Sequence, residues 1–324
     1  MQTLDLARFS HQKGNHCGST SLRDILRYGE NEVSEALVFG LASGLGFIYF
    51  PEMKLLNGRS MGFEGDFFQL QGRPIEWAGN WDPKAMAQVL ALDQPILVLS
   101  DIYYLSYYDD THFPGHSLVV VGIDLDNQTV QVADVIADQL QEIPLSALKA
   151  AMEIEFPGMV NPYSWAGIAP FPLRRDRPTL VQAILRVCQR MLKSEFLIEG
   201  TKAMRVLAQD LPSWPEGQGW AQAARFAYQT IEKRGTGGGA FRLMYGEFLR
   251  EAAELVPELR SIRAPERMRQ AGESWREVAL ILKSVSLEQD PSGFGQAAEK
   301  VVSIADLEEG LYLDLEASLA RATS

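Results

Sequence analysis

The chain has 324 residues, enough for two domains, and its apolar content of 46% is ordinary for a globular protein. Its 42 acidic and 30 basic side chains give a formal net charge of −12 at pH 7, which argues against non-specific binding to nucleic acid or to an anionic membrane. The sequence has no run of about 18 apolar residues, no leader-like N-terminus and no zinc-ligand spacing. We therefore expect a cytoplasmic protein with no metal site.

The first chemically informative stretch is Gly-Asn-His-Cys-Gly-Ser-Thr at residues 14–20. Apolar residues at helical spacing after it predict a helix from Cys17 to about Tyr28. This places the Cys17 sulfur at a helix N-terminus, where unpaired N–H groups and the helix dipole stabilise a thiolate. Because the thiolate is the reactive form, we interpret Cys17 as a nucleophile.

The second cysteine has a different context. Cys188 falls on an apolar helical stripe with Leu180, Ile184, Val187 and Met191. It is therefore predicted to be a small buried side chain in a core. The four histidines all lie in the first 116 residues, so acid–base chemistry near neutral pH is expected in the N-terminal half.

The N-terminal half predicts a mixture of helices and strands. We expect helices at 35–41 and 83–92, the second capped by Asp82, and a tight turn at Asn57-Gly58. Residues 67–70 do not distinguish helix from strand. Strands are predicted at 47–50, 96–101, 117–122 and 129–134.

His116 opens one of these strands and Asp134 ends the next, around a turn at 124–128. An even-length hairpin loop would place the two side chains on opposite faces of the sheet. An odd loop, or a bulge at Gly122, would make them diagonal neighbours on one face. A Cys-His-Asp triad therefore requires one of these two irregularities. Asp124 and Asp126 compete with Asp134 as the acidic member, although their turn position favours a role in the loop.

The character of the chain changes after residues 170–178, which have the composition of a linker. From residue 179 onward the apolar periodicity is helical, with helices predicted at 180–209, 219–233, 238–256, 265–287 and 295–321. We expect two domains, a catalytic domain at 1–172 and a helical domain at 179–324.

A family resemblance is carried by two sets of residues, one in the N-terminal half and one in the helical remainder. The first is His16-Cys17-Gly18-Ser19-Thr20, Ser34-Glu35-Ala36, Phe39-Gly40-Leu41, Gly44-Leu45-Gly46-Phe47 and 115–122, Gly-His-Ser-Leu-Val-Val-Val-Gly. The order nucleophile, base, acid resembles papain-like cysteine peptidases, and these stretches more closely resemble the butirosin biosynthesis protein H family over residues 10–140. The helical remainder, with Gly-Thr-Gly-Gly-Gly-Ala-Phe-Arg at 235–242, resembles the uncharacterised domain often fused to it.

The resemblance implies an α+β papain-like domain followed by an α-helical domain. It also implies an acyltransferase of secondary metabolism that moves an acyl group from a carrier-protein thioester to an amine. Cys17 would accept the acyl group, His116 would be the general base and Asp134 would orient it. The implied partners are an acyl or peptidyl carrier protein and an amine-bearing small molecule. The protein itself would bind no cofactor, and the carrier's phosphopantetheine would be the substrate arm.

The oxyanion hole departs from the papain-like pattern. Those enzymes place a glutamine six residues before the cysteine, whereas here that position is His11 and Gln12 lies five before. Spacing favours His11 and chemistry favours Gln12 as the donor. His16 either contributes to the site or fills the loop beside the nucleophile.

Further residues are candidates for substrate binding. Asp101, Tyr104 and Tyr107 either line a substrate cleft or belong to an aromatic loop packed on the sheet. Thr236, Gly237 and Gly238, with Arg242 nearby, either cap a helix or hold the phosphate of a pantetheine arm. Two other functions remain open: a peptidase or amidase with the same triad, and a non-catalytic binding protein that retains the fold.

Overall fold

The computed structural model describes residues 1–155, 160–196 and 198–321 of the chain. It combines helices and sheets in two compact units, so the α+β class expected from the sequence is confirmed. The first unit contains residues 1–38 and 64–174, and the second contains residues 39–63 and the chain from residue 175 onward. Residues 39–63 therefore group with the C-terminal helices, whereas the sequence suggested a division in simple chain order.

The first unit is built on a seven-stranded antiparallel sheet. Its strands are β1 (Gln2–Thr3), β4 (Ala78–Gly79), β5 (Ile96–Asp101), β6 (Pro114–Asp124), β7 (Thr129–Ala133), β8 (Gln141–Pro144) and β9 (Ser164–Gly167). The order is β4-β9-β5-β6-β7-β8, with β1 paired to β6. The central strands β5 and β6 are buried almost throughout, which explains their continuous apolar sequence.

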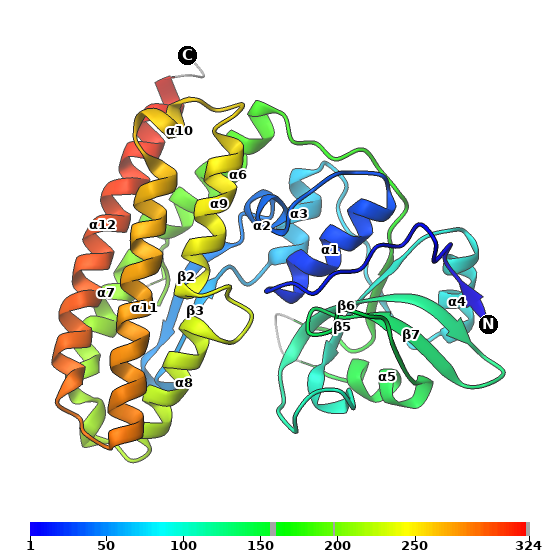
Figure 1. Ribbon diagram of the computed structural model, residues 1–324, viewed down its shortest axis with the longest axis horizontal. Helices are drawn as coiled ribbons and strands as arrows, with labels where there is room; N and C mark the ends of the chain where they lie inside the picture. The colour runs from blue at the N-terminus through cyan, green and yellow to red at the C-terminus, as the bar shows by residue number, and fades with distance from the viewer. Residues whose placement is uncertain (156–159, 197, 322–324) are drawn as a thin grey trace. The chain divides into compact units, whose positions relative to one another are not determined.

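Three helices flank this sheet in the part of the chain described above, α1 (Cys17–Tyr28), α4 (Pro83–Ala91) and α5 (Leu145–Met152), and α3 (Phe63–Leu70) lies mostly in the same unit. The helix α1 packs against β6, whereas α5 packs against β5 and β7, and Figure 1 shows them on opposite sides of these strands. Asp82 caps α4 as predicted, since its carboxylate accepts from the Ala85 amide at 2.9 Å. The undecided residues 67–70 are helical and belong to α3.

The second unit joins a hairpin to a set of helices. The hairpin pairs β2 (Leu45–Phe50) with β3 (Leu55–Arg59) through the 3₁₀ turn η1 (Pro51–Met53). The tight turn predicted at Asn57-Gly58 is wrong, because these residues lie inside β3 and Asn57 pairs with Ile48. A Cβ at Gly58 would lie 2.6 Å from the Ala240 carbonyl oxygen, so a close backbone approach explains this glycine.

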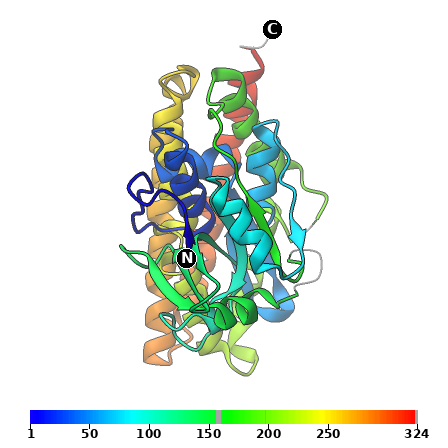
Figure 2. The ribbon, with the colours of Figure 1, turned by 90° about the vertical axis from the view of Figure 1, so that its right-hand side faces the viewer.

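The helices that follow confirm the helical pattern of the C-terminal half. They are α6 (Arg177–Lys193), α7 (Gly200–Asp210), α8 (Trp220–Glu232), α9 (Arg242–Ala252), α10 (Glu258–Ser261), α11 (Ala264–Glu288) and α12 (Gly293–Arg321), with 3₁₀ segments η3 (Leu211–Glu216) and η4 (Gly239–Phe241). The long helices α11 and α12 pack side by side (Figure 1 and Figure 2). The predicted helix 180–209 is two helices, α6 and α7. The helix α2 (Glu35–Leu41), predicted with the same bounds, spans the boundary between the units.

Candidate active site

A β-bulge places His116 and Asp134 on one face of the sheet. Near the turn, Gly122 pairs with Gln131, but further along Val120 pairs with Val132, so Val121 is an extra residue in β6. The shift restores the register in which Val119 opposes Ala133. His116 and the residue after Ala133, Asp134, therefore become diagonal neighbours. This is the bulge alternative predicted from the sequence, because the loop between the paired Asp124 and Thr129 has an even length.

The side chains of the two residues bond directly. The His116 Nε2 lies 2.9 Å from Oδ2 and 3.0 Å from Oδ1 of Asp134, and both side chains are almost completely buried. A hydrogen bond also joins His116 to the Cys17 side chain. Because Asp134 occupies Nε2, Nδ1 is the ring nitrogen left to face the sulfur. The structure thus brings together Cys17, His116 and Asp134.

Cys17 is the first residue of α1, as the sequence predicted. His16 caps this helix: its backbone is extended, and its Nδ1 accepts from the Ser19 amide at 3.2 Å. His16 therefore serves the helix terminus that carries the nucleophile. The cysteine residue is 8% exposed and is therefore buried.

Two tyrosines hold the far side of Asp134. Tyr107 donates its hydroxyl to Oδ2 at 2.9 Å, and Tyr108 donates to Oδ1 at 2.8 Å. The Tyr108 ring also stands edge-on to the His116 ring at 5.4 Å between centroids. Tyr107, considered from the sequence as a cleft residue, thus bonds a member of the candidate triad. Tyr108 was not identified as a site residue, although its place in the same aromatic loop beside Tyr107 was a usable indication.

The charges of this cluster favour an imidazolium. Burial lowers the pKa of His116, but the Asp134 carboxylate and the hydrogen bonds to Asp134 and Cys17 outweigh it and raise the pKa to about 10. Burial likewise opposes ionisation of Asp134, yet His116, Tyr108 and Tyr107 keep its pKa below the ordinary value. Burial and the neighbouring Asp134 raise the pKa of both tyrosines, so they remain protonated donors.

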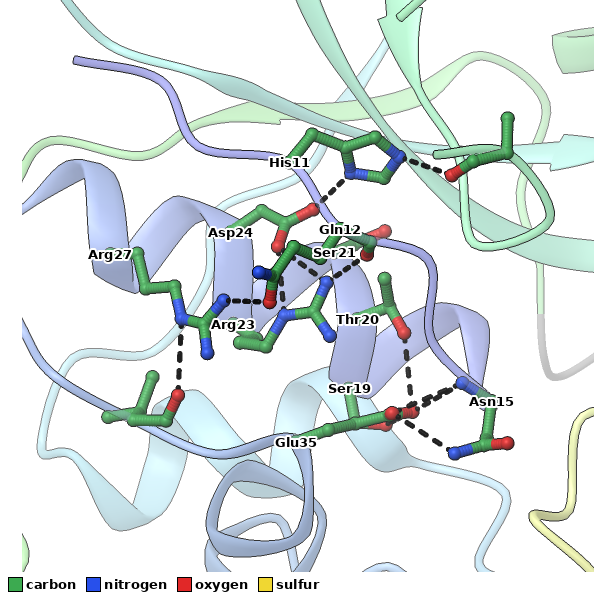
Figure 3. Close-up of polar contacts among 12 residues, drawn as sticks. His11, Gln12, Asn15, Ser19, Thr20, Ser21, Arg23, Asp24, Arg27 and Glu35 are labelled. Atoms are coloured by element: carbon green, nitrogen blue, oxygen red, sulfur yellow. Dashed lines mark hydrogen bonds and ion pairs between the residues drawn. The ribbon is translucent and has the colours of Figure 1, made fainter. Parts of the chain in front are cut away.

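A single carboxylate organises the loop before Cys17 (Figure 3). Glu35, at the start of α2, accepts from the amides of Asn15 at 3.0 Å and of His16 at 2.7 Å. It also accepts from the hydroxyls of Ser19 at 3.1 Å and Thr20 at 3.2 Å, both on α1. Ser34-Glu35-Ala36 is one of the stretches that carry the family resemblance, but the sequence alone does not assign this role to Glu35, because a glutamate in the first turn of a helix is common on electrostatic grounds.

The two oxyanion-hole candidates are engaged elsewhere (Figure 3). The His11 Nδ1 lies 2.6 Å from Asp24 Oδ2, and its Nε2 lies 2.9 Å from the Ala137 carbonyl oxygen. The Gln12 Oε1 accepts from Arg27 at 2.9 Å. Asp24 and Arg27 lie seven and ten residues beyond Cys17, or about 10–15 Å along the helix. The structure thus contradicts both assignments: His11 has no ring nitrogen left to donate, and Gln12 is directed to the other end of α1.

Asp101 shapes the loop that carries the tyrosines. Its carboxylate accepts from the amides of Phe113 at 2.8 Å and Tyr103 at 3.2 Å, and it pairs with His112 Nδ1 at 2.7 Å. This side chain is buried and committed to the loop, which favours the structural alternative for it. Tyr104 lies in the short 3₁₀ segment η2 (Ile102–Tyr104) and is 39% exposed.

Most of the groups expected to hold a phosphate in the glycine loop of the second unit are bonded internally. The Thr236 hydroxyl donates to the Ile231 carbonyl and accepts from the Gly238 amide, both at 2.9 Å. Gly237 lies between them with a positive φ of 67°. The side chain of Arg242 is completely buried and pairs with Glu308 at 2.8 Å. The substrate role proposed for Thr236 and Arg242 is wrong, because both side chains are buried and bonded internally, and the Gly238 amide is also taken. The role of Gly237 stays a prediction.

Cys188 is a core residue of α6, as predicted. Its side chain is fully buried, and burial, reinforced by Glu316, raises its thiol pKa to about 12. Within the described ranges, no group of three His, Cys, Asp or Glu side chains gathers as a metal ion would require. Among those same residues, no helix has the length and apolar character needed to cross a membrane.

Comparison with known families agrees with the resemblance seen in the sequence. Residues 16–135 match the model for butirosin biosynthesis protein H, N-terminal, and residues 148–315 match a domain of unknown function, DUF4872. A search of curated proteins finds no match. The first match includes Cys17, His116 and Asp134, and the second covers more than half of the chain. The chain therefore belongs to the butirosin biosynthesis protein H family with its fused DUF4872 domain, a family named for the biosynthesis of a secondary metabolite.

Proposed function

We propose that this protein is a cysteine-dependent acyltransferase that carries an acyl group as a thioester on Cys17. One observation carries the proposal: the sulfur at the start of α1 is hydrogen-bonded to His116, whose other nitrogen is fixed by a buried carboxylate. A nucleophile, a base and a group that orients the base are the components of covalent acyl transfer. The family's place in secondary metabolism supports this choice of reaction.

The first half of the reaction forms the acyl-enzyme. The Cys17 thiolate attacks the carbonyl carbon of a thioester donor, and the resulting oxyanion lies at the positive end of α1. When the intermediate collapses, the bond to the donor sulfur breaks and the His116 imidazolium gives its proton to the departing thiolate. The products are the Cys17 thioester and the free thiol of the donor.

The second half releases the acyl group. An amine attacks the Cys17 thioester, and neutral His116 takes the proton that the amine loses. Collapse of this intermediate breaks the carbon–sulfur bond, forms the amide and leaves the Cys17 thiolate beside the His116 imidazolium. Asp134 keeps Nε2 protonated and the ring oriented in both halves, and Tyr107 and Tyr108 hold Asp134.

We further propose that the first unit is papain-like. The supporting features are a cysteine that opens a helix, a histidine near the start of a neighbouring strand and an acidic residue after the next antiparallel strand. The proposed donor is the phosphopantetheine thioester of an acyl or peptidyl carrier protein, and the proposed acceptor is an amine-bearing small molecule. The protein itself needs no bound cofactor for this chemistry.

The proposal is tested by mass spectrometry of the full chain mixed with acyl-pantetheine thioesters. We expect acylation on Cys17, its loss in Cys17→Ala, and its retention in the matched control Cys188→Ala. Added amines should release the acyl group faster than buffer alone. Release at one rate with or without amines, together with cleavage of peptides or amides, would identify a hydrolase. A folded protein with no acylation by any thioester would favour a binding protein.

A further inference from the structure

His11 joins two parts of the candidate site. It precedes Cys17 on the same loop, and its Nε2 reaches Ala137 in the turn that follows Asp134. A second bond reinforces this contact, since the Gly14 amide donates to the Val135 carbonyl at 3.2 Å. The turn is closed by the Ala137 amide, which donates to the Asp134 carbonyl at 3.1 Å. The loop that carries the nucleophile is thus attached to the turn that carries the acid.

The partners of His11 determine its protonation. Its Nδ1 lies 2.6 Å from a carboxylate oxygen of Asp24, and its Nε2 lies 2.9 Å from a backbone carbonyl (Figure 3). The carbonyl is only an acceptor. Asp24 is also an acceptor here, because its other oxygen receives Arg23 Nε at 2.9 Å and pairs with Arg23 Nη2 at 2.8 Å. A neutral imidazole has one N–H and can satisfy one of the two partners, whereas an imidazolium satisfies both.

The charged groups around His11 are consistent with an imidazolium. From α1, Asp24 favours the charged ring and Arg23 opposes it. On the turn, Asp138 follows Ala137 and is exposed. Arg27, also on α1, donates a hydrogen bond to Gln12. Burial lowers the pKa of His11, but the hydrogen bond and charge of Asp24 and the bond to Ala137 outweigh it, so the pKa is raised.

We propose that His11, as an imidazolium, is a positioning residue that holds the Cys17 loop against the Asp134 turn and makes this attachment sensitive to pH. The proposal rests on the proposed function of the Cys17 site. Because the pKa of His11 is raised on folding, the attachment is complete below its ordinary value of 6.5 and is lost as pH rises through its value in the folded protein. Deprotonation removes one of the two bonds and frees one side of the attachment.

The direct test is ¹⁵N NMR of the full chain with labelled histidine, in which His11→Asn identifies the His11 signals by their loss. We expect both His11 ring nitrogens to be protonated at pH 6 and to titrate above 6.5. The protection of the Gly14 amide against hydrogen exchange, corrected for the intrinsic rate, should fall over the same pH range. A His11 ring that titrates at or below 6.5 overturns the proposal.

The functional test compares alkylation of Cys17 by iodoacetamide across pH in the wild type and two variants. His11→Gln keeps a donor near the position of Nε2 and His11→Asn keeps one near Nδ1, but neither variant titrates. The wild type should react several-fold faster than either variant below the His11 pKa, and the ratio should approach one above it. His112→Gln removes a different histidine–aspartate pair, in which the histidine is exposed, and should show no such pH-dependent ratio.

The outcomes separate this proposal from the proposed function. A ratio that is constant at every pH shows that His11 is merely structural and overturns its role as a charged positioning residue. Iodoacetamide and NMR need no acyl donor, so both readouts decide the state of His11 even if no thioester acylates Cys17. Failure of acylation with a titrating His11 therefore counts against the acyltransferase alone.

Discussion

Each unit of the protein contains a cluster of polar side chains around a buried carboxylate, Asp134 in the first unit and Glu308 in the second, and the two clusters differ in what their protons can do. In the second unit, Arg242 Nε and Nη2 bond the two oxygens of Glu308 at 2.8 and 2.9 Å. Trp275 and Tyr312 donate to the same carboxylate at 3.1 and 2.9 Å. Arg242 also bonds the carbonyls of Gly46, Gly58 and Ala240.

The cluster of the first unit is equally well bonded, but it contains groups that exchange protons. Asp134 accepts from His116, Tyr107 and Tyr108, much as Glu308 accepts from its donors. The two clusters differ in the cationic partner of the carboxylate. His116 can lose its proton and bonds a thiol, whereas Arg242 is permanently charged and bonds backbone carbonyls. The comparison teaches that a buried carboxylate with several hydrogen-bond donors does not by itself identify a catalytic cluster. A nucleophile paired with a titratable base does.

The largest effect expected from this contrast is the loss of acylation in Cys17→Ala. Without the sulfur no thioester forms, so transfer should fall by at least ~10³-fold. The free energy of unfolding should fall by about 1–3 kcal/mol, because the substitution removes the hydrogen bond between a buried sulfur and His116. Mass spectrometry and urea unfolding measure the two quantities. Acylation that persists at another residue of Cys17→Ala would refute the assignment of the nucleophile.

For Glu308→Gln, in the cluster of the second unit, the main expected effect is on stability and not on acylation. This variant leaves the charge of Arg242 buried without its counter-ion, so we expect a loss of about 3–5 kcal/mol in the free energy of unfolding. The neighbouring Glu309 pairs with Arg205 near the surface, where both side chains are about 40% exposed. Glu309→Gln is therefore the matched control and should cost about 0–1 kcal/mol. Equal, small losses would contradict the structural role of the Arg242 cluster.

The two clusters also show which features of the fold and of the candidate site a single sequence can predict. Apolar periodicity predicted α1 and α2 with the observed bounds, and it placed Cys188 in a core. The triad residues came from order and spacing, and the need for a bulge followed from the side-chain period of a strand. The helix bounds, the burial of Cys188 and the bulge are confirmed, because they depend on local pattern, which a single sequence contains. The catalytic roles of the triad residues stay predictions.

The errors arose where partners are distant in the chain. Arg242 looks like a phosphate ligand beside three glycines, but Glu308 and the carbonyl of Gly46 decide its role. His11 has the spacing of an oxyanion donor, yet Asp24 and Ala137 take both of its nitrogens. Long-range pairing of this kind leaves no periodic trace in one sequence, so chemistry alone could not rank the alternatives.

A third prediction concerns the stability of the cluster around His116. Its pKa is raised from 6.5 to about 10, so the charged ring contributes stability that is complete below 6.5 and is lost as pH rises toward 10. We expect the wild type to lose roughly 4 kcal/mol relative to His116→Gln over this window, since one pKa unit corresponds to about 1.4 kcal/mol and the loss is not yet complete at pH 10. Urea unfolding at pH 6 and at pH 10 measures the difference.

The wild type must be compared with His116→Gln, because the pKa of His11 is also raised and His11 therefore also contributes stability that is lost as pH rises. Its contribution is present in both the wild type and His116→Gln, so it cancels in the difference. If the two proteins lose stability in parallel as pH rises, His116 is not charged in the folded state and the imidazolium–thiolate pair is refuted.

The smallest expected effects come from the tyrosines that bind Asp134. Tyr107→Phe and Tyr108→Phe each remove one hydroxyl that donates to a buried carboxylate, a bond worth about 1.5–3 kcal/mol. Because Asp134 keeps His116 and the other tyrosine, we expect acylation of Cys17 to slow by roughly tenfold in each variant. Tyr108 should matter more, since its hydroxyl is also 3.4 Å from His116 Nε2. Tyr104→Phe is the matched control on the same loop, with an exposed ring, and should react at the wild-type rate. Equal slowing in all three variants would mean that the loop acts through substrate contact rather than through Asp134.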